Sequence, residues 1–295
     1  MVTSLAAAGQ LQFKPRLGVL YMLGAIFVLG STDALVKWSS GNIDPIQIGF
    51  TRFLVSLVMV LWIVGRSEPG FTVLRTRRPI EHAARAFCAA IELTAFYIAI
   101  SLIPLPTAMS IIAASPIFGT LLGVVFLRER LRLGGWVAIL AGFIGMLLVV
   151  QPEEGVDSTL GTIAVLTSVV LWCLAQLFAR RLSTTESNLT ILFYYALGGV
   201  IILGIATPFV WSDPAPLEWI AILAVGIFGC VGQYFLILSL RYAPLSVLAP
   251  FEYSALIWAS LYGYIFWGDV LGPIAIVGVA IIVAACLYIT RTMEH

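Results

Sequence analysis

The chain has 295 residues, of which 61% are hydrophobic and 11% charged, and its mean hydropathy is +1.04. Soluble domains carry about a quarter charged residues, so this composition is typical of a protein that lies in lipid. A net charge of +1 gives no reason to expect a nucleic acid as partner. The four cysteines lie singly in apolar segments, which predicts neither a metal site nor a disulfide framework.

Apolar segments long enough to cross a bilayer follow one another along the whole chain. The first is preceded by Lys14 and Arg16 but lacks a clear cleavage site, so we expect an uncleaved first helix. Backbone amides in hydrocarbon must be satisfied within the segment, which predicts helices. Only short connections remain, which excludes a separate soluble catalytic domain. The segments lie at 17–38, 45–65, 82–103, 107–127, 133–151, 160–180, 188–210, 218–240, 245–267 and 271–290.

The distribution of basic residues predicts the orientation, because cytoplasmic loops retain Lys and Arg. With the N-terminus inside, the outer loops hold no basic residue, and acidic residues such as Asp44 and Asp213 fall outside. We therefore expect both termini in the cytoplasm, and His82 at the inner surface in contact with solvent. The inner basic residues are Lys14, Arg16, Arg66, Arg75, Arg77, Arg78, Arg85, Arg128, Arg130, Arg132, Arg180, Arg181, Arg241 and Arg291.

An internal repeat divides the chain. The segment YIAISLIPLPTAMS, which begins at Tyr97, is weakly similar to FLILSLRYAPLSVLA, which begins at Phe235, and the shared features come in the same order. Each half, 1–151 and 152–295, holds five predicted spans, and an odd number of spans inverts the second half in the membrane. Inverted repeats are the architecture in which a site near the bilayer midplane faces either side in turn. The pattern therefore favours a transporter.

The segment PLPTAMSIIAASPIFGTLLGVVFLRERL ends on an acidic corner at Glu129. With the ten spans and the paired halves, it resembles the EamA-type members of the drug/metabolite transporter superfamily over nearly the whole chain. The second half departs from the first by having Asp269 where Glu129 stands. The resemblance implies an all-α bundle of 5+5 helices and solute translocation. It leaves the substrate open, because members carry amino acids, amines, purine-like compounds, S-adenosylmethionine or vitamins.

Ionisable side chains at bilayer depth are costly and mark functional candidates. Asp33 and Lys37 stand four apart on one helical face, which predicts an ion pair or gate near the outer mouth. Arg52 lies too deep to reach the interface and needs a carboxylate partner, either a fixed one or that of a substrate. Glu92 and Glu252 lie near the midplane, where a carboxylate suits proton coupling or capture of an ammonium group.

Deep aromatic and polar residues suit the wall of an organic-solute cavity, although helix packing is the more common role for any one of them. These candidates for substrate binding are Tyr97, Trp172, Gln176, Tyr253 and Trp258, in addition to Arg52, Glu92 and Glu252. Pro116 and Pro250 lie inside predicted helices and are candidate hinges, since proline interrupts the helical hydrogen bonds.

We predict an inner-membrane secondary transporter of amino acids or related small metabolites, with export favoured. The expected partners are the lipid bilayer, the solute and, as a candidate coupling ion, the proton; no cofactor or metal is predicted. We expect a monomer or a weak dimer. One alternative is an uptake carrier for an organic cation or nucleoside-like metabolite such as S-adenosylmethionine. Another is a membrane-embedded sensor or enzyme, although the sequence contains no Walker loop and no catalytic motif.

Overall fold

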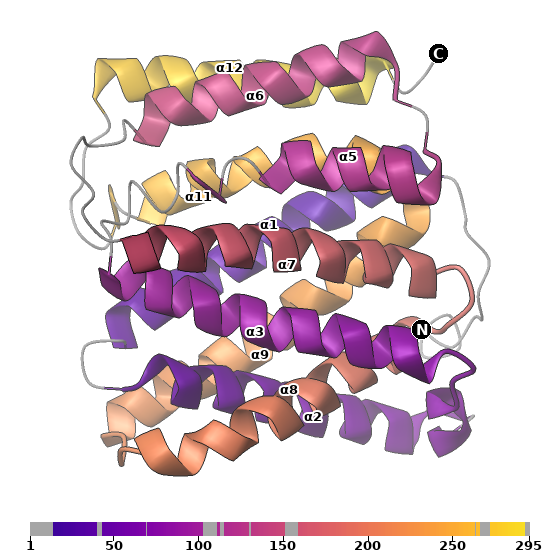
Figure 1. The fold of residues 1–295 in the computed structure, drawn as a ribbon, viewed down its shortest axis with the longest axis vertical. Coiled ribbons are helices and arrows are strands. Elements are labelled where there is room, and N and C mark those ends of the chain that lie inside the picture. Colours follow the sequence, from indigo (N-terminus) through magenta and orange to yellow (C-terminus); the bar gives the residue numbers. More distant parts are fainter. Residues whose placement is uncertain are drawn as a thin grey trace.

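The computed structural model describes residues 14–39, 43–68, 70–102, 111–112, 115–129, 131–150, 159–262, 264–265 and 272–292. Within these residues all regular structure is helical (Figure 1). The all-α class predicted from the sequence is therefore confirmed. The Pro104 turn and Asp269 lie outside the described residues.

The helices fall on the predicted spans, with ends that differ by a few residues. The fourth predicted span is described from its middle onward. The ninth is not one regular helix but three consecutive segments. The elements are α1 (Pro15–Ser39), α2 (Pro45–Arg66), the 3-10 helix η1 (Gly70–Leu74), α3 (Pro79–Leu102), α5 (Ser115–Leu127), α6 (Leu133–Val150), α7 (Thr159–Leu182), α8 (Asn188–Val210), α9 (Pro216–Tyr242), α10 (Leu245–Leu248), the 3-10 helix η2 (Ala249–Ser254), α11 (Ala255–Tyr262) and α12 (Pro273–Thr292).

Local side chains determine where two of the long helices begin. The Asp44 carboxylate accepts a hydrogen bond of 2.8 Å from the Ile46 amide, and Pro45 follows directly as the first residue of α2. At the start of α8, the Ser187 hydroxyl accepts a bond of 3.1 Å from the Thr190 amide. These caps satisfy amides that have no partner within the helix.

The outer surface of the bundle is apolar. By length and composition, α1, α2, α7, α8 and α9 are each sufficient to cross a membrane, and α5, α6, α10 to α11, and α12 contain shorter apolar helices. Large apolar side chains on these helices remain exposed, as lipid contact requires. Examples are Leu20, Val58, Phe118, Leu140, Ile205, Phe209, Ile220 and Ile276.

The helices form two layers whose axes run roughly across the view in Figure 1. In one layer α3 packs on α7 and α7 on α5. In the other, α9 packs on α1 and α1 on α11. The pairs α2 with α8 and α6 with α12 join the layers at the two edges of the bundle. Side chains that point between the layers are thereby enclosed by both halves of the chain.

The candidate hinges lie in different settings. Pro250 lies in η2, where the ninth span changes from α-helix to 3-10 helix and back. Pro116 lies in α5, next to Ser115, where the described part of that helix begins. A hinge role for either residue remains a prediction.

A close approach between α2 and α8 generates the first testable prediction. A Cβ at Gly199 would lie 2.3 Å from the ring of Phe53, which is 1% exposed and cannot move aside. Gly199→Ala is expected to lower the stability of the purified protein by about 1–3 kcal/mol through overpacking. The measurement is the unfolding transition in detergent. Gly65→Ala is the control, because no described atom lies within 4 Å of that Cβ; equal losses in both variants would contradict the packing explanation.

Candidate functional site

Arg52 of α2 is the centre of a group of polar side chains from four helices. Its side chain is 7% exposed, and its stem lies against Gly229 of α9, where a Cβ would come within 2.6 Å of the Arg52 Nε atom. The absence of a side chain at Gly229 therefore makes room for the arginine. Within electrostatic reach of Arg52 lie Asp33 of α1, Glu92 and Tyr97 of α3, and Tyr195 of α8.

Charges of opposite sign lie near one another in this group without direct pairing. Among the described residues, no ion pair within 4.0 Å joins Arg52 to Asp33 or Glu92. The Tyr97 hydroxyl lies beside the guanidinium without meeting the geometry of a hydrogen bond. Asp33 is exposed to solvent and Glu92 partly exposed, although protein surrounds both. The two carboxylates therefore border accessible space inside the bundle.

Glu252 forms a second polar centre on η2. One of its carboxylate oxygens, Oε2, accepts hydrogen bonds of 3.3 Å from the Ser115 hydroxyl and 3.3 Å from the Trp172 indole N–H. The side chain is partly accessible. Glu252 thus contacts α7 through Trp172, and α3, which carries Glu92, packs on the same helix.

Several predicted site residues lie elsewhere. Tyr253 packs on α6, where a Cβ at Gly142 would come within 2.5 Å of its ring, and it is 3% exposed. It packs with Met146 of α6 and Ile282 of α12, and its role in solute binding remains a prediction. Trp258 packs edge-on against Phe27 of α1, with ring centroids 4.8 Å apart.

For two further candidate residues, the structure shows, among the described residues, no contact with either polar centre. Gln176 lies one turn after Trp172 on α7, is 3% exposed and has an Nε2 atom without a partner among the described residues. Lys37 is on α1, four residues after Asp33, but its side chain lies outside what the structure describes. The predicted pairing of Asp33 with Lys37 therefore remains a prediction.

Residues that sequence reasoning did not select complete both centres. Tyr195 lies within electrostatic reach of Arg52 and Glu92, and it packs against Phe53 with ring centroids 5.0 Å apart. Ser115 donates to Glu252. Neither residue carries a charge or a motif, so nothing in the sequence distinguishes it from an ordinary helix-packing residue.

The expectation that His82 contacts solvent is wrong. Its side chain is 2% exposed and packs against Tyr194, with ring centroids 4.6 Å apart. Arg85, counted above among the inner basic residues, is also 2% exposed. It lies over the Tyr195 ring and donates to the Ile191 carbonyl and to Gln233. The face of α3 that carries His82 and Arg85 is buried, and α8 packs on this helix.

The arginine-rich end of the bundle, where α3 begins and α7 and α9 end, is held by a clasp centred on Glu129. The Glu129 carboxylate accepts bonds of 3.1 and 2.9 Å from the amides of Leu245 and Ser246, which begin α10. It also pairs with Arg180 of α7 at 3.5 Å, and Arg180 donates to the Leu240 carbonyl. One carboxylate thus joins the ends of α5, α7 and α9 to the start of α10.

The backbone around Glu129 is shaped to present this side chain. Arg128 adopts a left-handed conformation with φ of 54°, which is uncommon outside glycine. The Glu129 amide donates to the Gly123 carbonyl at 3.1 Å. A Cβ at Gly123 would come within 2.7 Å of the Glu129 carboxylate, so glycine is needed there to keep the clasp closed.

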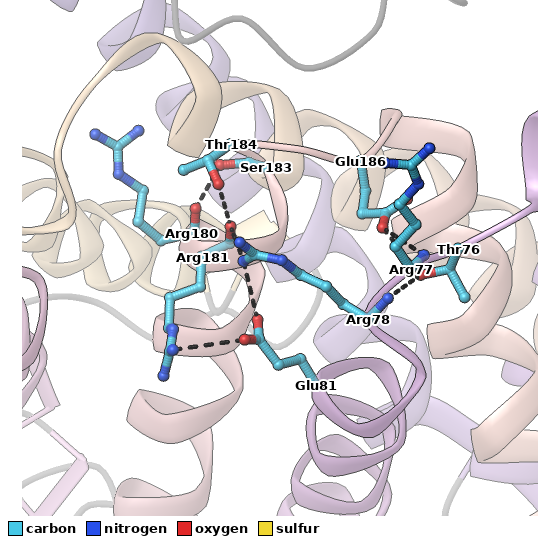
Figure 2. Close-up of polar contacts among 9 residues, drawn as sticks. All are labelled: Thr76, Arg77, Arg78, Glu81, Arg180, Arg181, Ser183, Thr184 and Glu186. Atoms are coloured by element: carbon cyan, nitrogen blue, oxygen red, sulfur yellow. Dashed lines mark hydrogen bonds and ion pairs between the residues drawn. The ribbon is translucent and has the colours of Figure 1, made fainter.

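Further polar contacts tie the same end together (Figure 2). Glu81 of α3 pairs with Arg78 and Arg181, each at 3.5 Å. Glu186 accepts from the Thr76 hydroxyl at 2.9 Å and from the Arg77 amide at 3.3 Å. Within the described part of the chain, the ion pairs all lie at this end. A surface pocket of about 300 Å³ opens beside Glu129 and Arg180.

The clasp leads to a second prediction. Glu129→Gln keeps the shape of the side chain but removes the charge that attracts Arg180 and strengthens the two amide bonds. We expect a loss of about 1–3 kcal/mol in stability, measured as the unfolding transition in detergent. Glu68→Gln, at an exposed position after α2, is the control and should change little; an unchanged Glu129→Gln protein would show that the clasp contributes nothing.

Comparison with known proteins supplies the family context for this geometry. A model described as the EamA-like transporter family matches residues 16–151 and again residues 159–291. A crystal structure superposes with a TM-score of 0.81 at 19% identity, covering 94% of this chain and 99% of that one. That similarity concerns the fold.

Three relatives match nearly their whole length. The pseudopaline exporter CntI of Pseudomonas aeruginosa is 28% identical, with 94% of this chain and 97% of the relative covered. The S-adenosylmethionine uptake transporter of Rickettsia prowazekii is 23% identical, with 92% of each chain covered. The riboflavin transporter of Vibrio cholerae is 25% identical, with 95% of each covered. The three names differ in solute, and two of them give opposite directions, export and uptake.

Proposed function

Because the chain belongs to the EamA-like transporter family, and is thus a multi-pass membrane transporter of the drug/metabolite type, we propose that it moves amino acids or related small metabolites by alternating access, with export favoured. The observation that supports the amino-acid proposal most directly is the group around Arg52. A cation and two carboxylates lie near one another there without direct ion pairs among the described residues.

This arrangement suits a zwitterion. The Arg52 guanidinium matches a carboxylate in geometry as well as charge, while Glu92 or Asp33 can accept from an ammonium group. An α-amino acid presents both groups on neighbouring atoms. A solute that bridges these side chains would replace the missing ion pairs and keep each charge neutralised away from water.

Alternating access is supported by the pairing of the helices. The packing of α1 on α9 corresponds to that of α7 on α3, and the packing of α1 on α11 to that of α7 on α5. Such matched contacts fit the proposed inverted repeat of 1–151 and 152–295. The Glu129 clasp supports a state closed at the arginine-rich end, which we propose faces the cytoplasm.

The main alternative is transport of an organic cation, such as S-adenosylmethionine. The carboxylates of Asp33, Glu92 and Glu252 favour it, because each could bind a cation, and one relative bears that name. An enzyme or sensor has less support, because the family and these relatives are transporters. Flux of labelled amino acids, S-adenosylmethionine and polyamines into proteoliposomes separates these possibilities.

Arg52 provides a direct test of the zwitterion proposal. Arg52→Lys keeps the charge but loses the planar fork, and we expect it to reduce amino-acid flux about tenfold, as for the loss of one charged hydrogen bond. The measurement is initial flux in proteoliposomes, normalised to the folded yield. Arg66→Lys is the matched control, because Arg66 is exposed at the end of the same helix and stacks on Trp62. Lost yield instead of lost flux would make Arg52 a structural residue.

Glu92 provides a test of coupling. If its carboxylate carries a proton during the cycle, Glu92→Gln removes the response of flux to an imposed pH gradient, because an amide does not titrate. The experiment compares flux with and without the gradient in the wild type, in Glu92→Gln and in the exposed control Glu68→Gln. A mutant that still responds to the gradient shows that coupling, if present, uses another group.

A further inference from the structure

We infer that the solute carries a second cation in addition to its amino-acid head group, and that Glu252 binds this distal cation. The inference rests on the proposed function and names the class of solute. It predicts preference for basic amino acids, or amino acids with another cationic tail, over neutral ones of the same length.

The charges of the interior are distributed unevenly. Arg52 lies near Asp33 and Glu92, whereas no lysine or arginine of the described residues forms an ion pair or a hydrogen bond with Glu252. Glu252 is therefore a carboxylate at bilayer depth for which the described chain provides no cation.

Glu252 is also arranged as a binding group. Ser115 and Trp172 both donate to Oε2, which holds the carboxylate in place. The other oxygen, Oε1, accepts no hydrogen bond among the described residues, and the side chain is partly accessible. The Trp172 indole lies beside the carboxylate, and aromatic rings attract cations. A solute cation can therefore meet a free carboxylate oxygen and an aromatic ring together.

Both centres lie along α7. Glu252 accepts a hydrogen bond from Trp172 of α7, and α3, which carries Glu92, packs on α7. The head group would bind between Arg52 and Glu92, and the tail would extend along α7 toward Glu252. A neutral amino acid would leave the Glu252 charge uncompensated, and this penalty gives the site its selectivity.

Four probes of similar length separate the two ends of such a solute. Lysine has all three charged groups; norleucine lacks the distal ammonium, cadaverine lacks the carboxylate, and 6-aminohexanoate lacks the α-ammonium. We expect the full chain in proteoliposomes to carry lysine about tenfold faster than norleucine, as for one charged hydrogen bond. Cadaverine and 6-aminohexanoate should fall below lysine because each lacks one head group.

Substitutions then assign the distal cation to Glu252. Glu252→Gln should collapse the ratio of lysine flux to norleucine flux toward one, and Glu252→Asp should retain part of it. Trp172→Phe keeps an aromatic ring but removes the N–H donor, and Ser115→Ala removes the other; each should lower the ratio by a smaller factor. If Glu252→Gln does not give a monodisperse protein, the Trp172 and Ser115 variants decide, and an unchanged ratio in both overturns the inference.

The outcomes distinguish this inference from the proposed function. Flux of none of the four probes contradicts the amino-acid proposal itself. Equal flux of lysine and norleucine leaves that proposal standing and overturns the role of Glu252. A Glu252→Gln variant that loses its response to a pH gradient but keeps its preference for lysine overturns the inference as well, because Glu252 would then carry a proton and not the solute.

Discussion

The cost of placing charge in hydrocarbon is the constraint on which this structure depends. Asp33, Arg52 and Glu92 lie on helices whose outer surfaces carry exposed apolar side chains, and Glu252 lies on η2 among buried residues. The two layers of helices enclose these groups and keep them from lipid. Gly229 contributes to this enclosure, because the stem of Arg52 occupies the space that a side chain at that position would fill.

The same constraint explains the contrast between the interior and the arginine-rich end. At that end the charged residues are paired directly, as in the contacts of Glu129 with Arg180 and of Glu81 with Arg181. In the interior, among the described residues, charges of opposite sign lie near one another without contact. Direct pairs hold helices together, whereas separated charges leave room for something to come between them. A transporter needs the first property at a closed end and the second at a binding site.

Much of the fold could be predicted, because hydrocarbon permits few structures and the apolar segments have the length of a span. The charged site candidates could also be predicted from the sequence, since an ionisable residue inside a membrane span differs clearly from its apolar neighbours. Their uncharged partners, Tyr195 and Ser115, could not be predicted, because in the sequence they look like ordinary packing residues. The directions of Tyr253 and Trp258 depend on the rotation of the ninth span, which a uniform helix does not describe. His82 was misjudged because neighbouring arginines suggested a surface that Tyr194 in fact covers.

The mixed helical geometry of the ninth span affects the direction in which Glu252 points. Successive residues turn by about 120° in a 3-10 helix and by about 100° in an α-helix. Glu252 comes three residues after Ala249, where η2 begins. Rewinding that stretch into α-helix would therefore rotate Glu252 by about 60° around the helix axis, away from Ser115 and Trp172. A small change in winding is therefore enough to withdraw this carboxylate from its partners.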